Sequence, residues 1–106
     1  MKINELKDEE KVYTTCFNDG ITFNASTEQI VNAIGEPQYR IPYDGDKTTR
    51  EWNLELEDGT PFTIYDWKEY RDFDDDEVVE WHVGNDFRDT ESKGKIVAAL
   101  KEVGLK

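Results

Sequence analysis

The sequence predicts an α+β domain, an antiparallel β-sheet of about five strands with two helices packed on one face, in the order β-β-α-β-β-β-α. Apolar Trp52, Leu54 and Leu56 alternate with polar residues, which is the period-2 pattern of a half-buried strand. Asp58-Gly59 follows, and its glycine allows the positive φ of a tight hairpin turn. Near the C-terminus, apolar residues at helical spacing predict a helix that covers the sheet.

Length and composition define the class of protein. A chain of 106 residues forms one domain, residues 1–106, in which the charged segment 1–10 is expected to be flexible. The single cysteine, Cys16, excludes an internal disulfide and is compatible with a reducing compartment. No apolar run approaches the roughly 20 residues of a membrane span, and the N-terminus lacks the apolar region of a signal peptide. We therefore expect a protein of the cytoplasm.

The formal net charge of −12 is extreme for this length. Such a charge repels the phosphate backbone, so it disfavours direct binding of DNA or RNA over a broad face. It suits a partner that is itself a basic protein. The alternative is that an acidic proteome simply produces acidic proteins.

The N-terminal third predicts a hairpin. Residues 12–17 and 21–23 are rich in β-branched and aromatic residues, and Asn18-Asp19-Gly20 between them is a turn signal. We therefore expect two short strands joined by a tight turn.

A short helix is expected to follow this hairpin. Ser26 and Gln29 form the sequence pattern of a capping box, which opens a helix. Gly35 is placed to end it, and Pro37 makes continuation unfavourable. Residues 38–47 then form a loop whose aromatic and arginine side chains favour local packing over contact with a partner.

The three central strands are expected to present one apolar face and one unusual outer face. Phe62 and Ile64 face the same way as Trp52, and a third inward row comes from residues 79, 81 and 83. The outward-facing side chains include Thr63, Tyr65, Trp67, Val78, Glu80 and His82. An exposed apolar sheet face most often marks an interface, so we expect self-association or a ligand there. The last helix is predicted to run to about Val103.

The chain carries no recognisable catalytic or metal-binding motif. One histidine and one cysteine are too few for a zinc site, and the acidic run at residues 72–77 has neither the glycine nor the ligand spacing of a calcium loop. This run is expected to be a solvated charge run whose self-repulsion keeps it mobile. Phosphate-loop, dinucleotide-binding and nucleophile-elbow patterns are also missing from the sequence. We expect a protein that is not an enzyme and has no metal or cofactor.

The remaining polar and aromatic groups suit a flat, charged ligand. Aromatic faces stack on bases, arginine pairs with phosphate, and amide groups bind ribose hydroxyls. The candidate ligand-binding residues are Arg50, Tyr65, Trp67, Arg71, His82, Asn85, Phe87 and Arg88. Alternatively, the aromatic residues pack against a second protomer or a folded-back loop.

The segment EW-x-L-x-x-x-DGT-x-x-TIYDWKEYR, followed by WH-x-G, resembles a family of small, mostly uncharacterised proteins encoded by bacteriophages and prophages. In that family a helix ending in G-E-P precedes the strands, as Gly35-Glu36-Pro37 does here, and a C-terminal helix follows a WHIGG motif. The likeness covers residues 26–106. Here Asn85 replaces the second glycine of that motif, so a backbone role for that glycine does not carry over.

The resemblance implies an early anti-defence factor acting in the host cytoplasm. One hypothesis is a homo-oligomeric sponge, similar to anti-Thoeris proteins, that sequesters a cyclic nucleotide or cyclic ADP-ribose-like signal. A second is a DNA mimic that blocks a basic restriction or CRISPR effector. Its phosphate-imitating carboxylates would be Glu55, Glu57, Asp72, Asp74, Asp75, Asp76 and Glu77. A third is a structural or accessory phage protein without a ligand.

Overall fold

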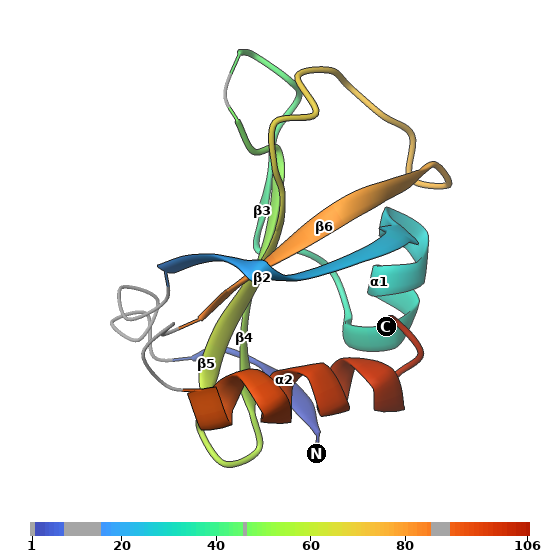
Figure 1. Cartoon of the computed structure of the whole chain (residues 1–106). Helices are drawn as coiled ribbons and strands as arrows, with labels where there is room; N and C mark the ends of the chain where they lie inside the picture. The colour runs from blue at the N-terminus through green and yellow to red at the C-terminus, as the bar shows by residue number, and fades with distance from the viewer. Residues whose placement is uncertain (1, 8–15, 46, 86–89) are drawn as a thin grey trace.

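A computed structural model of the chain describes residues 2–7, 16–45, 47–85 and 90–106 (Figure 1). Its elements are β1 (Ile3–Glu5), β2 (Cys16–Ser26), α1 (Thr27–Ile34), β3 (Tyr39–Arg40), β4 (Arg50–Leu56), β5 (Pro61–Asp66), β6 (Val78–Asn85) and α2 (Thr90–Glu102). The strands form one antiparallel sheet in the order β1-β4-β5-β6-β2, and β3 also pairs with β4. The predicted α+β class is confirmed. In the part of the chain that is described, neither helix has the length and apolarity needed to cross a membrane.

The β4–β5 hairpin forms as its sequence pattern predicts. Trp52 lies opposite Ile64 and Leu54 opposite Phe62, and all four side chains are at most 1% exposed. Gly59 takes the turn position that requires a positive φ, at 89°. Hydrogen bonds from Thr60 to the Asp58 carboxylate, assisted by Lys95, lower the pKa of Asp58 to about 2.

The side chains of Trp52 and Trp81 connect the central strands to neighbouring segments through hydrogen bonds. The rings of Trp52 and Trp81 meet edge to face, with centroids 5.3 Å apart. Each buried indole N–H has an acceptor, because Trp52 Nε1 donates to the Gly35 carbonyl and Trp81 Nε1 to the Ala25 carbonyl, both at 2.8 Å. The central sheet is thus bonded to the end of α1 and to β2.

Both helices contribute to the same core. Ile30 of α1 and Ile96 and Leu100 of α2 are fully buried in one cluster with the inward rows of the sheet. Their placement on a single face of the sheet stays a prediction. The capping box is confirmed, since the Ser26 hydroxyl accepts from Gln29 N and the Gln29 side chain accepts from Ser26 N.

The predicted N-terminal hairpin is wrong. Residues 16–26 form one long strand, β2, that pairs with β6 along its length. Asn18 pairs with Val83 and Thr22 pairs with His82, the next residue of β6 in line. Residues 19–21 of β2 are therefore extra residues between two adjacent pairs, and the register shifts there. The turn signal at residues 18–20 therefore marks a bulge and not a chain reversal. The start of the predicted first strand, residues 12–15, lies outside the described residues.

Part of the segment expected to be flexible is also ordered. β1 pairs with β4, with Ile3 opposite Leu56, and Leu6 N donates to the Asn53 carbonyl. Leu6 is 7% exposed and Ile3 packs against the core. Residues 3–6 of this charged stretch therefore lie along the edge of the sheet, with two apolar side chains turned to it.

The capping box at Ser26 can be tested by mutation. Ser26→Ala removes the acceptor for Gln29 N, and we expect it to lower the free energy of unfolding by about 1 kcal/mol. Ser26→Thr retains a hydroxyl and should lose less. Urea denaturation followed by circular dichroism measures both variants, and equal stability of Ser26→Ala and the wild type would contradict the role of the cap.

Candidate functional site

A buried carboxylate joins the start of β4 to the end of β5. Asp66, the last residue of β5, is 1% exposed. It accepts hydrogen bonds from the backbone N–H groups of Thr49 and Arg50 and from the Thr49 hydroxyl, all at 2.8 Å. Because each carboxylate oxygen accepts at least one hydrogen bond, the group can be buried without an unsatisfied oxygen atom. These bonds fix the backbone from which the Arg50 side chain extends.

Arg50 is itself buried and makes contacts with two further segments. Its Nη1 donates to the Thr27 hydroxyl at 2.8 Å and its Nη2 to the Phe73 carbonyl at 2.9 Å. The guanidinium carbon lies 4.1 Å from the centroid of the Phe73 ring, in cation–π geometry. Burial lowers the pKa of Arg50, and the nearby charge of Arg40 lowers it further.

One carboxylate oxygen lies between the two arginines. Asp75 Oδ1 is 2.5 Å from Arg40 Nη2 and 3.3 Å from Arg50 Nη2. The hydrogen bond from Arg40 is the main reason that the pKa of Asp75 is lowered. Asp75 therefore carries a negative charge at neutral pH, placed where two positive charges converge.

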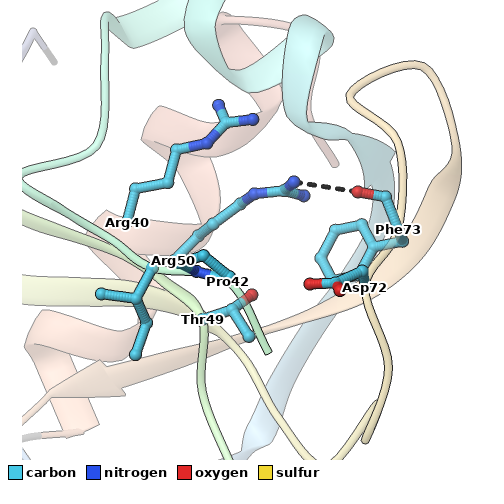
Figure 2. A pocket seen from close by; sticks show the side chains of 7 residues that line it. Arg40, Pro42, Thr49, Arg50, Asp72 and Phe73 are labelled. Atoms are coloured by element: carbon cyan, nitrogen blue, oxygen red, sulfur yellow. Dashed lines mark hydrogen bonds between the residues drawn. The ribbon is translucent and has the colours of Figure 1, made fainter. Parts of the chain in front are cut away.

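These arginines line a cleft of about 430 Å³, which we call the arginine cleft. Its lining residues are Arg40, Ile41, Pro42, Thr49, Arg50, Asp72 and Phe73. Figure 2 shows Arg40 and Arg50 on one wall of the cleft, with Asp72 and Phe73 facing them from the loop that leads to β6. The site thus combines two cations, an apolar wall and a carboxylate.

The acidic loop is only partly a solvated charge run. Besides Asp75, the Asp72 carboxylate accepts from Tyr43 N at 2.7 Å, and Glu77 forms an ion pair with Arg71. Asp74 and Asp76 are exposed. The expected self-repulsion is therefore offset by contacts of the loop with cationic and backbone donors. Within the described residues, no group of three or more acidic, histidine or cysteine side chains could hold a metal ion.

The carboxylates of the proposed DNA mimic do not gather on one surface. Glu55 and Glu57 lie at the hairpin end of β4, whereas residues 72–77 lie near its beginning, which Figure 1 shows as opposite ends of the sheet. The length of β4 separates the two groups by about 20 Å, at about 3.3 Å per residue. Glu57 also accepts from Lys2 N, and Asp75 and Glu77 are paired with arginines.

The structure brings three of the predicted ligand-binding residues together. The ring of Tyr65 stacks on His82 with centroids 6.1 Å apart, and Trp67 meets Tyr65 edge to face at 6.0 Å. The expected open apolar face is present only in part: Val78 is 61% exposed, but Tyr65 is 7% exposed and Thr63 is 4% exposed. This part of the outer face is buried within the single chain.

The other predicted ligand-binding residues lie elsewhere. Arg50 alternates with the outward residues of β4 and points to the inner side, into the arginine cleft. Asn85 is fully buried, and Arg71 is exposed beside the cleft, where its pairing with Glu77 raises the pKa of Arg71. Phe87 and Arg88 lie outside the described residues.

Sequence reasoning missed Arg40, Asp75 and Phe73 as members of one site with Arg50. Arg40 is an unusual residue for a solvated loop, but its ion-pair partner, Asp75, is 35 positions away in sequence. A clearer signal was the position of Arg50 two residues before Trp52, on the inward side of the strand. An inward arginine needs buried acceptors, so it predicts a polar site at that end of the sheet.

The outer-face row that contains the predicted Tyr65 and His82 also includes Tyr39 and Glu51, which sequence reasoning missed. Tyr39 lies opposite Glu51, Glu51 opposite Tyr65, and Tyr65 opposite His82. Burial raises the pKa of Glu51. The row therefore holds a carboxylate whose charged form is disfavoured by the fold.

Comparison of the chain with protein-family models, curated proteins and solved structures found no match.

The role of Arg50 is tested by its removal. Arg50→Met leaves the Phe73 carbonyl, the Thr27 hydroxyl and Asp75 without this donor, so we expect the free energy of unfolding to fall by about 2–4 kcal/mol. Arg71→Met is the matched control, because Arg71 is exposed and contacts the same loop. Its effect in urea denaturation should be much smaller; equal losses in the two variants would contradict the structural role of Arg50.

The raised pKa of Glu51 gives a pH dependence of known sign. The folded state binds the proton of Glu51 more tightly than the unfolded state does. Burying the charged carboxylate therefore lowers the free energy of unfolding at high pH, and this loss is absent below the ordinary pKa of 4.5, where the group is protonated in both states. Glu51→Gln should therefore raise the melting temperature at pH 7 and lose this advantage near pH 4. Glu36→Gln, at an exposed site, controls for the change in net charge. An advantage of Glu51→Gln that did not depend on pH would exclude burial of the charge as its cause.

Proposed function

We propose that the protein is a non-enzymatic binding protein that sequesters a small phosphate-bearing molecule in the arginine cleft. The observation that carries this proposal is the convergence of Arg40 and Arg50 on one oxygen position. Guanidinium groups bind phosphate through paired, charge-assisted hydrogen bonds, and two of them can hold one phosphate from both sides. In the free protein this position is taken by a carboxylate oxygen, which is the closest side-chain counterpart of a phosphate oxygen.

The size and lining of the cleft favour a ligand of mononucleotide size. Its volume of about 430 Å³ lies in the lower part of the range of about 300–1,000 Å³ that is typical of small-molecule sites. Ile41, Pro42 and Phe73 supply apolar surface for a base or sugar, beside the cations for the phosphate. A larger cyclic dinucleotide would extend beyond the cleft into solvent.

The resemblance to phage-encoded proteins directs the choice of ligand. Immune signals built from cyclic nucleotides or cyclic ADP-ribose carry phosphate on a ring system, which is the chemistry the cleft would recognise. Sequestration needs tight binding and no catalytic group. The cleft lies within one chain, so binding here does not depend on the homo-oligomer expected from the sequence, and light scattering tests that expectation separately.

A thermal-shift screen against cyclic mononucleotides, cyclic dinucleotides and cyclic ADP-ribose isomers tests the proposal. A ligand at about 100 times its dissociation constant stabilises the folded state by about 2.7 kcal/mol, which is a shift of several degrees for a domain of this size. We expect Arg40→Ala to abolish the shift, because it removes the accessible cation without removing the buried one.

Arg71→Ala is the control for this screen. It removes the same charge from an exposed position outside the lining of the cleft, so the ligand-induced shift should persist. A shift that survives Arg40→Ala would place the ligand elsewhere, and the outer-face cluster of Tyr65, Trp67 and His82 would be the next site to mutate. No shift with any compound would contradict the proposal and favour a basic protein partner.

A further inference from the structure

The carboxylate of Asp75 lies between the guanidinium groups of Arg40 and Arg50, two of the residues that line the arginine cleft; Asp75 itself is not part of that lining. A single oxygen, Oδ1, contacts Nη2 of both Arg40 and Arg50. We propose that Asp75 is an internal competitor, which holds the two guanidinium groups together in the free protein and is displaced when a phosphate-bearing ligand binds. This inference rests on the proposed function, because it describes how the same site is controlled.

The competitor is accessible to exchange. The side chain of Asp75 is 49% exposed and that of Arg40 is 42% exposed, whereas that of Arg50 is 9% exposed. An ion pair that is open to solvent contributes little net stability, so a ligand with a higher charge density can replace it. Arg50 stays in place during the exchange, since Thr27, Phe73 and the backbone bond to Asp66 hold it.

The loop backbone is held independently of the carboxylate. The Asp75 carbonyl accepts from Glu28 N at the start of α1, at 2.9 Å, and Glu77 N donates to the Asp74 carbonyl at 3.1 Å. The Phe73 carbonyl remains bonded to Arg50. The side chain of Asp75 can therefore rotate away while residues 73–77 keep their path.

An internal competitor sets a threshold for binding. The apparent affinity of a ligand is its intrinsic affinity multiplied by the fraction of molecules in which the anion position between Arg40 and Arg50 is free. A ligand that offers two phosphate oxygens to both arginines overcomes this competition better than a single carboxylate from solvent can. The competitor also separates two like charges that would otherwise repel each other, as the effect of Arg40 on Arg50 indicates.

The test compares Asp75→Asn with Asp74→Asn, which removes the same charge from an exposed neighbour in the same loop. The probes are inorganic phosphate and 3′,5′-cyclic AMP, titrated by calorimetry into each folded variant. We expect Asp75→Asn to bind at least one probe at least tenfold more tightly than the wild type, and Asp74→Asn to differ from the wild type by less than about twofold, because a solvent-exposed charge is screened.

The outcomes separate this inference from the proposed function. If the wild type binds a probe and Asp75→Asn binds it no more tightly, the competitor is excluded while the binding function stands. If both substitutions tighten binding equally, the cause is the lower negative charge of the loop as a whole, which repels the anionic probe less. In that case the inference is also wrong. If neither probe binds any variant, the cleft is not an anion site, so the proposed function and this inference both fail.

A measurement on the wild type covers the case in which Asp75→Asn does not fold. Carbon-detected NMR of the Asp75 carboxyl group follows its titration with and without saturating inorganic phosphate. Displacement removes the hydrogen bond from Arg40, so the pKa of Asp75 should rise toward its ordinary value when the probe is bound. An unchanged pKa in the presence of bound phosphate would overturn the proposal.

Discussion

The buried guanidinium of Arg50 is the constraint around which one end of this fold is arranged. A charge removed from water is tolerated only where hydrogen-bond acceptors and a counter-charge surround it. Here these groups come from two separate segments: the Thr27 hydroxyl at the start of α1, and the Phe73 carbonyl and the Asp75 carboxylate in the loop before β6. Asp66 fixes the backbone of the same residue from β5. Removing the guanidinium would leave the start of α1 and the loop before β6 without their common partner.

The same requirement bears on how the proposed anion site could lie in a chain with a net charge of −12. The field of the whole protein repels an anionic ligand, so only a place where cations are concentrated and partly shielded from water can bind one. Arg40 and Arg50 provide that concentration, and of the two it is Arg50, whose side chain is 9% exposed, that is shielded from water. The repulsion acts at long range and is screened by salt, whereas the contacts in the cleft act at short range.

The elements that the sequence predicts correctly are those specified by neighbouring residues. The alternation from Trp52 to Leu56, the Asp58-Gly59 turn and the Ser26–Gln29 capping box each depend on residues a few positions apart. The errors concern partners that are distant in sequence. Residues 18–20 have the composition of a turn, but pairing of β2 with β6, about 60 positions away, holds the strand extended and leaves a bulge. The ion pairs beside the arginine cleft join residues 40 and 50 to residue 75, and no local pattern indicates which carboxylate will meet which arginine.

The two functions suggested by the sequence use the same side chains in opposite ways. A DNA mimic needs unpaired carboxylates, and a binding protein for phosphate-bearing signals needs unpaired arginines. In the free protein Asp75 and Arg40 neutralise each other, so neither group is fully available. A ligand that takes Arg40 releases the carboxylate of Asp75 beside the exposed Asp74 and Asp76. Under the proposed exchange, a ligand bound to Arg40 would thus leave the surface of the loop more acidic than it is in the free protein.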